Sequence, residues 1–157
     1  MCIETATRFN GEFVKYLFKG YTSPEVIINP TKKINTKKPI IIGAGYKPGH
    51  SSDMDAVLLA KQFKADRILN LSNIDYVYTK DPRKFKSAKK IKEISWKDFR
   101  KNIVGNTWNP GKNAPFDPIA SKLAQKMGLE VAILRGTNLK EVDNAISGKK
   151  FKGTIVK

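Results

Sequence analysis

The chain has 157 residues, a length that fits one domain able to bury roughly two thirds of the surface exposed by the unfolded chain. Lys and Arg number 30 against 14 Asp and Glu, so the formal net charge of +16 attracts polyanions and phosphorylated small molecules. No apolar run approaches the roughly 18 residues of a membrane span, and no secretion signal follows Met1. Cys2 is the single cysteine, which excludes an internal disulfide. These features predict a soluble, cytoplasmic protein without a membrane partner.

The excess of positive charge falls mainly in three stretches. They are Lys32 to Lys38, Lys80 to Lys101, and a C-terminal group of Lys149, Lys150, Lys152 and Lys157. Lys dominates all three, and neither an aromatic ladder nor a helix-turn-helix pattern accompanies them, so a solvated surface is the preferred interpretation. A nucleic-acid groove is the less favoured alternative. Salt-sensitive binding of RNA without binding of a nucleotide would support that alternative.

The first predicted element is a helix over Ala6 to Phe18, because its apolar residues recur at helical spacing. The residues that gather on one face are Phe9, Phe13, Val14 and Leu17. Either this face packs on the core or it forms a subunit contact. The following stretch, Gly20 to Lys38, is polar and carries prolines, which predicts a surface excursion around a short strand at Val26 to Ile28.

A strand, a glycine-rich turn and a helix are predicted within Pro39 to Asp55. Ile40 to Ile42 form the apolar strand, Gly43 to Gly45 the turn, and the helix begins at Ser52 or Asp53. Small residues allow close approach of backbone N–H groups to a ligand, and a helix start favours anions. The alternative is an ordinary capped helix after an ordinary buried strand.

Helices and strands alternate in the rest of the chain. The predicted strands are Arg67 to Asn73, Leu129 to Leu134 and Thr154 to Val156. The predicted helices are an apolar helix through Phe63, one at about Trp96 to Ile103 and one at Thr137 to Ser147, and a loop is predicted at Gly105 to Lys112. A further helix is opened by Asp117 and Pro118 and ended by Gly128, with Ile119, Leu123 and Met127 inward. This alternation predicts an α/β fold: a single domain over residues 1–157, in which helices cover both faces of a mainly parallel sheet as a three-layer αβα sandwich.

Three predicted strand ends carry turns with polar, glycine or aspartate residues. They are Gly43 to Ser52, Ser72 to Asp81, and Arg135 to Thr137. Ligands of open α/β sheets collect at the carboxyl ends of the strands. The first two turns are neighbours along the chain, so we expect a bipartite small-molecule site.

Four ordered motifs resemble those of uridylate (UMP) kinases from the archaeal-type branch of the amino acid kinase family. The motifs are A-T-R-F-N at 6–10, Y-K-P-G-H-S-S-D at 46–53, N-L-S-N-I-D-Y-V-Y-T-K-D-P at 70–82 and A-P-F-D-P-I-A-S-K-L-A at 114–124. The resemblance covers essentially the whole chain. It implies the amino acid kinase fold and transfer of a phosphoryl group from ATP to UMP, with Mg²⁺, in pyrimidine nucleotide biosynthesis. It also implies a hexamer with a subunit contact at the Ala6 to Phe18 helix.

The resemblance assigns site residues by position. The UMP-binding loop falls on Tyr46, Lys47, Pro48, Gly49, His50, Ser51 and Ser52, with Asp53 at the helix start, and the ATP-contacting positions fall on Ser72, Tyr78 and Asp81. His50 can donate to a phosphate or ribose oxygen, although a plain surface-loop histidine is the alternative. No residue is assigned as a catalyst or metal ligand. Lys47 and Asp117 stand as candidates for a catalytic role, with Asp117 first of all an N-cap.

The chain departs from the family pattern at several points. Tyr46 and Lys47 stand where the family more often has Thr and His, and Tyr76 stands at a usual glycine, so it has to avoid a positive φ. The family's first strand with its G-G-S loop and the next G-G-G turn have no counterpart. We therefore expect the chain to correspond to the C-terminal two thirds of the family domain, truncated at its N-terminus. Lys47, Lys80 and Lys112 are cations that could replace the missing loops in part. A kinase for another small acceptor, a non-catalytic nucleotide-binding remnant and one half of a split enzyme are the alternatives.

Overall fold

The computed structural model describes residues 3–107 and 114–157, and the predictions for Cys2, Lys112 and part of the 105–112 loop lie outside them. Contacts between Cα atoms divide the chain after Lys64 into two compact units, unit 1 before this point and unit 2 after it. The prediction of a single domain stays a prediction. No helix in the described part of the chain is long and apolar enough to cross a membrane.

Unit 1 contains two helices, α1 (Ile3–Leu17) and α2 (Ser52–Phe63). The segments between them pair only at two isolated parallel bridges, Thr22 with Ile40 and Ile27 with Gly43. The continuous strands predicted at 26–28 and 40–42 are therefore wrong. The bridges are five residues apart on the first segment (22 to 27) and three residues apart on the second (40 to 43). The two segments therefore cannot stay in register between the bridges.

The glycines after the 40–42 segment make room for the two helices of unit 1. A Cβ at Gly43 would lie 2.5 Å from Leu59 Cδ1 of α2, and a Cβ at Gly45 would lie 2.8 Å from Glu4 Cα of α1. The contact at Gly45 is with helix backbone and leaves no space for a side chain, whereas at Gly43 the end of the Leu59 side chain would have to move. The structural reason for these two small residues is thus helix packing, and no approach to a ligand is needed to explain them.

Helix α1 leaves its aromatic face open. Phe9 is 75% exposed, and Phe13, Tyr16 and Leu17 are also exposed. The interpretation of this helix as core-facing is therefore wrong for Phe9, Phe13 and Leu17. A contiguous apolar surface of this kind on a helix marks an interaction site.

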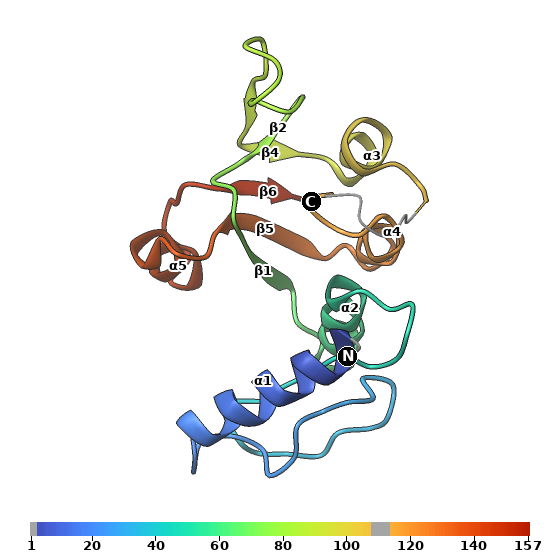
Figure 1. The fold of residues 1–157 in the computed structure, drawn as a ribbon, viewed down its shortest axis with the longest axis vertical. Helices are drawn as coiled ribbons and strands as arrows, with labels where there is room; N and C mark the ends of the chain where they lie inside the picture. Colours follow the sequence, from blue (N-terminus) through green and yellow to red (C-terminus); the bar gives the residue numbers. More distant parts are fainter. Residues whose placement is uncertain (1–2, 108–113) are drawn as a thin grey trace. The chain divides into compact units, whose positions relative to one another are not determined.

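Unit 2 is built on a four-stranded sheet of order β1-β5-β6-β4 (Figure 1). The strands are β1 (Arg67–Ser72), β5 (Glu130–Arg135), β6 (Thr154–Val156) and β4 (Glu93–Ile94). β1 pairs in parallel with β5, and β4 with β6, whereas β5 and β6 are antiparallel. The prediction of an α/β fold with a mainly parallel sheet is confirmed.

Helices lie on both sides of this sheet, with α5 on one side and α3 and α4 on the other (Figure 1). Their bounds are α3 (Trp96–Phe99), α4 (Pro118–Met127) and α5 (Leu139–Ile146), and a π-helical turn η1 (Arg100–Val104) continues α3. Alternate residues of β5 face opposite ways. Ala132 and Leu134 pack with Ala145 of α5 in one core layer. Unit 2 therefore has the predicted three layers.

The aromatic core of unit 2 lies around α3. Trp96, Phe99 and Phe116 are buried, and the Trp96 ring meets Phe99 edge-on at 5.9 Å between ring centroids. The Trp96 indole donates to the Leu129 carbonyl oxygen at 2.7 Å. This bond ties α3 to the start of β5, because Leu129 immediately precedes that strand.

Helix α4 begins and ends as predicted but turns a different face inward. Asp117 caps it by accepting from the N–H groups of Ile119 and Ala120, both at 2.7 Å, and Gly128 ends it with φ +65°. The predicted inward position Ile119 is 51% exposed. The buried residues of the helix are Pro118, Ala120, Ser121 and Ala124. Small side chains let α4 approach its neighbours closely, so the size of the residues decides the face rather than their hydrophobicity.

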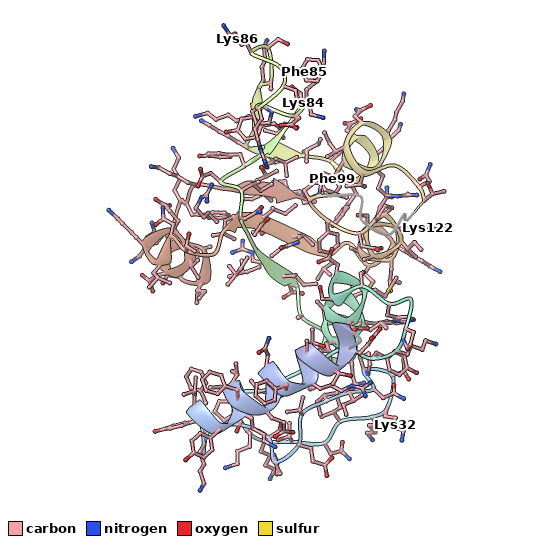
Figure 2. All side chains as sticks on the ribbon, in the orientation of Figure 1. Lys32, Lys84, Phe85, Lys86, Phe99 and Lys122 are labelled. Carbon is pink, nitrogen blue, oxygen red and sulfur yellow. The ribbon has the colours of Figure 1, made fainter. Side chains whose placement is uncertain are left out.

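An arm projects from the sheet between β2 (Val77–Tyr78) and β3 (Lys90–Ile91), which pair antiparallel. Its base is held by buried Thr154, whose hydroxyl accepts from Val77 N–H at 2.8 Å and donates to the Ile91 carbonyl oxygen at 2.5 Å. Figure 2 shows Lys84, Phe85 and Lys86 at the tip, pointing away from the sheet. The arm therefore has a rigid base and a basic, exposed tip.

Candidate functional site

The predicted acceptor loop is a tight turn that leads into α2. His50 N–H donates to the Lys47 carbonyl oxygen at 3.1 Å, with Pro48 and Gly49 between them. Gly49 has φ +83°, which matches the third position of a type II turn, where Pro is favoured at the second position. The sequence Lys-Pro-Gly-His thus encodes its own conformation.

Asp55 is the residue that organises this loop, although the sequence analysis did not single it out. It is only 6% exposed, one turn into α2. Its Oδ2 accepts from Tyr46 N–H at 3.1 Å, and its Oδ1 lies 3.3 Å from His50 Nδ1. A buried carboxylate with two partners from one loop fixes both ends of that loop. The burial of Asp55 depends on the fold, so no local sequence signal could have revealed its role.

The contact with Asp55 also decides what His50 can offer a ligand. Nδ1 must carry a hydrogen to bond the carboxylate, so in the neutral ring Nε2 is an acceptor. His50 can then accept from a ribose hydroxyl, and it donates to a phosphate only when the ring is protonated. The expectation that His50 donates to a phosphate or ribose oxygen is therefore limited to the protonated ring.

Two side chains of α1 hold the other side of the loop. Arg8 donates through Nε to the Gly45 carbonyl oxygen at 3.0 Å and through Nη2 to that of Tyr46 at 2.8 Å. Thr7 Oγ1 accepts from Gly45 N–H at 3.0 Å. Thr7 and Arg8 are the T-R residues of the A-T-R-F-N motif, so this motif was the sequence signal for their contact with the loop. The N–H groups of Gly45 and Tyr46 are bonded within the protein, so these two groups do not donate to a ligand.

The outer surface of the loop is polar and cationic. Lys47 Nζ lies 5.1 Å from the centre of the Tyr46 ring, and that ring meets His50 edge-on at 5.2 Å. Ser51 caps α2, since its hydroxyl accepts from Met54 N–H at 3.2 Å, as predicted for the helix start. An ammonium group and the start of a twelve-residue helix suit an anionic ligand. Ser52 is exposed beside them as the first helical residue.

In unit 2, the three predicted ATP-contacting residues line one hollow of about 480 Å³. Ser72 ends β1 and its carbonyl oxygen accepts from Gly136 N–H at 2.9 Å. Tyr78 lies in β2, and Asp81 follows in the arm, where its Oδ1 accepts from Arg83 N–H at 2.9 Å. The remaining lining residues are Asn73, Ile74, Tyr76, Val77, Lys80, Pro82, Arg83, Ile103, Ala114 and Pro115.

This hollow, the donor hollow, contains groups that suit a nucleoside triphosphate. Its volume lies within the range of small-molecule sites, and it offers tyrosine rings, the Asp81 carboxylate and the cations Lys80 and Arg83. Arg83 was missed by the sequence analysis, because a lysine-rich arm gives no sign of which cation turns toward a cavity. Tyr76 avoids a positive φ as expected, since Lys64 is the one described non-glycine residue with such an angle.

Beside the donor hollow, an ion pair ties the end of β5 to the turn between β1 and β2. Arg135 Nε lies 2.7 Å from Asp75 Oδ1, with both side chains partly exposed. The hydrogen bond to Asp75, together with the charge of that carboxylate, raises the pKa of Arg135. The guanidinium therefore keeps its charge at any working pH, and the pair adds little stability because water screens it.

A metal ion would have few protein ligands here. Within residues 3–107 and 114–157, no group of three or more His, Cys, Asp or Glu side chains could hold a metal. Mg²⁺ in phosphoryl-transfer sites is held mostly by substrate phosphates and water with one or two carboxylates. Asp81 is a carboxylate of the donor hollow and fits that requirement.

Comparison with known proteins places the chain in a family. The sequence profile described as "Amino acid kinase family" matches residues 17–135. The chain belongs to the amino acid kinase family. This confirms the predicted relationship and the fold. The match includes both the acceptor loop and the donor hollow.

Individual members of the family that resemble the chain carry the name uridylate kinase. The protein of Methanobrevibacter smithii is 34% identical over 117 residues, which are 74% of this chain and 52% of that protein. The protein of Pyrococcus abyssi is 31% identical over 153 residues, covering 96% of this chain and 67% of that protein. The chain thus spans about half to two thirds of the length of these relatives.

Solved structures agree with the fold assignment. Uridylate kinase from Archaeoglobus fulgidus superposes with a TM-score of 0.76 at 25% identity, covering 98% of this chain and 69% of that one. UMP kinase from Ureaplasma parvum gives a TM-score of 0.72 at 20% identity, covering 98% and 68%. The second likeness shows the fold alone.

Proposed function

We propose that the chain acts as a uridylate kinase, transferring the γ-phosphoryl group of ATP to UMP to give ADP and UDP. The observation that carries the proposal is the gathering of Ser72, Tyr78 and Asp81 around one hollow in a member of the amino acid kinase family. Two relatives that are 34% identical to the chain carry the name uridylate kinase. The loop organised by Asp55 supplies the acceptor side of the proposal.

In this proposal the 46–52 loop binds UMP. The Lys47 ammonium and the positive end of α2 attract the phosphate. His50, held by Asp55, accepts from a ribose hydroxyl. Pre-ordering of the loop by Arg8 and Thr7 lowers the entropic cost of binding.

The donor hollow binds ATP in the same proposal. Tyr78 flanks the base, Asp81 accepts from ribose hydroxyls or holds Mg²⁺ through water, and Lys80 and Arg83 offset phosphate charge. When bound on the phosphates, Mg²⁺ neutralises the charge that develops on the migrating group. A phosphate oxygen of UMP forms the new bond to phosphorus as the bond to the ADP oxygen breaks. The chemistry needs mainly positioning and charge compensation.

The test is binding measured by calorimetry, with coupled detection of UDP formation from ATP and UMP. Lys47→Ala should weaken UMP binding by roughly 10- to 150-fold, the value of a hydrogen bond to a charged group, with ATP binding unchanged. His50→Ala should weaken it by roughly 2- to 12-fold, the value of a neutral hydrogen bond to a ribose hydroxyl. Tyr78→Ala and Asp81→Asn should weaken ATP binding and leave UMP binding unchanged. Lys61→Ala, an exposed lysine of α2, and Tyr21→Ala, an exposed tyrosine, are the matched controls.

Turnover that falls in these variants would support the kinase. Binding of both nucleotides without turnover would support the second candidate, a nucleotide-binding fragment or one part of a split enzyme. The observation that favours this second candidate is that the chain spans 52% and 58% of the length of two uridylate kinase relatives. A folded sample that neither binds nor turns over UMP would contradict the assignment, and preference for another small acceptor would redirect it within the family.

We also propose that copies of the chain associate through α1. The exposed side chains Phe9, Phe13, Tyr16 and Leu17 form an apolar face on this helix. Sedimentation of the purified chain should give a mass above that of the monomer. Phe9→Glu combined with Tyr16→Glu should lower it to the monomer, whereas Thr5→Glu with Asn10→Glu adds the same charge at exposed polar positions and should not. A wild-type chain that stays monomeric at high concentration would contradict the association.

A further inference from the structure

A second hollow of unit 2, of about 670 Å³, has five lysines among its fourteen lining residues, and we call it the lysine hollow. It lies along α5, the segment that follows α5, and residues beside β4 and β6. Its lysines are Lys92, Lys140, Lys149, Lys150 and Lys152. No residue of the lysine hollow belongs to the predicted acceptor loop or to the predicted ATP-contacting set.

The lining of the lysine hollow carries an excess of positive charge, because five lysines and Arg67 stand against the carboxylates Glu93 and Glu141. None of its five lysines forms an ion pair with a carboxylate of the described residues. Of the two lining carboxylates, Glu93 pairs with Lys157 at 3.0 Å, and Glu141 accepts from the Lys152 backbone N–H at 2.8 Å. Like charges gathered around a concave surface attract a counter-ion strongly.

Aromatic side chains add an apolar wall. Phe151 and Tyr76 both line the lysine hollow. Tyr76 lines the donor hollow as well, so the two hollows share one side chain. The Lys90 ammonium lies 5.3 Å from the centre of the Tyr76 ring and adds a further cation at this edge.

We propose that the lysine hollow is a second anion site that binds a free polyphosphate chain, such as that of a nucleoside triphosphate. Five ammonium groups call for a ligand with several closely spaced charges, which a triphosphate has and a single phosphate or carboxylate lacks. The volume suits a nucleotide. The site does not rest on the proposed kinase activity, because none of its five lysines belongs to the acceptor loop or lines the donor hollow.

The experiment is titration of the ¹⁵N-labelled chain with sodium tripolyphosphate at 0.15 M salt, followed by NMR. Amide signals of residues 147–153 report on the lysine hollow, and those of 78–83 report on the donor hollow, so each site is scored separately. The test variant combines Lys149→Gln, Lys150→Gln and Lys152→Gln. The control combines Lys97→Gln, Lys101→Gln and Lys122→Gln, which removes the same charge from exposed lysines outside the hollow. Figure 2 shows Lys122 pointing outward from α4.

The 147–153 signals should shift to saturation, with affinity at least tenfold weaker in the test variant and within twofold of wild type in the control. An equal loss in both variants would overturn the site, because general charge attraction would then explain the binding. Absence of shifts at 147–153 would also overturn it. A single-stranded RNA that shifts these signals when neither tripolyphosphate nor ATP does would assign the surface to nucleic acid instead.

Discussion

Replacing Asp55 by alanine should weaken UMP binding by roughly 10- to 150-fold, the equivalent of about 1.5–3 kcal/mol for a hydrogen bond to a charged group. The buried carboxylate holds Tyr46 N–H at 3.1 Å and the His50 ring at 3.3 Å, so its loss releases both ends of the acceptor loop. The ligand-contacting side chains themselves would remain. Calorimetry with UMP at fixed salt measures the effect.

Asp55→Asn separates the charge from the shape of the side chain. Asparagine keeps an oxygen for Tyr46 N–H but loses the negative charge beside His50, so intermediate affinity is expected. Glu25→Gln is the control, because it removes an exposed carboxylate of unit 1 that forms no ion pair in the described chain. UMP affinity of a folded Asp55→Ala variant equal to that of wild type would refute the organising role of Asp55.

Replacing Trp96 by alanine should lower the free energy of unfolding by about 3–5 kcal/mol, the usual cost of removing a buried Trp or Phe side chain. Trp96 is buried against Phe99 and Phe116, and its indole is the donor to the Leu129 carbonyl oxygen. Because a domain is stable by only about 5–15 kcal/mol, this loss is large. Urea unfolding followed by circular dichroism measures it without relying on tryptophan fluorescence.

Two variants divide the contribution of Trp96. Trp96→Phe keeps an aromatic ring but removes the donor to Leu129, so it should cost about 1–3 kcal/mol. Lys97→Ala changes the next, exposed residue of α3 and should stay within about 0.5 kcal/mol of wild type. A Trp96→Ala variant that loses less than Trp96→Phe would show that the ring does not anchor α3 to β5.

Much of the candidate site is readable from the sequence because adjacent residues encode it. Pro48 and Gly49 set the acceptor turn, and Ser51 caps α2 with its own hydroxyl. Ser72, Tyr78 and Asp81 lie close enough along the chain to reach one hollow once a strand and a turn are predicted between them. Such features depend on the rotation of a few backbone bonds, which local residue type controls.

Helix ends and sheet strands of unit 2 are predictable for the same reason. The Asp117 side chain caps the start of α4, and the positive φ of Gly128 ends the helix. The predicted strand at 154–156 coincides with β6. The sequence by itself therefore determined the class of the fold, the two ends of α4 and the conformation of the turn at 47–50.

Tertiary structure alone decided which residues meet across long sequence separations. The bonds of Arg8 to Gly45 and Tyr46 span 37 and 38 residues. The 40–42 segment failed to form a strand because its partner segment has a different number of residues between the bridges. Likewise, α4 buries Ala120 and Ala124 because close packing favours small residues over Ile119. Local propensity cannot specify these outcomes, since each depends on the shape and spacing of a distant partner.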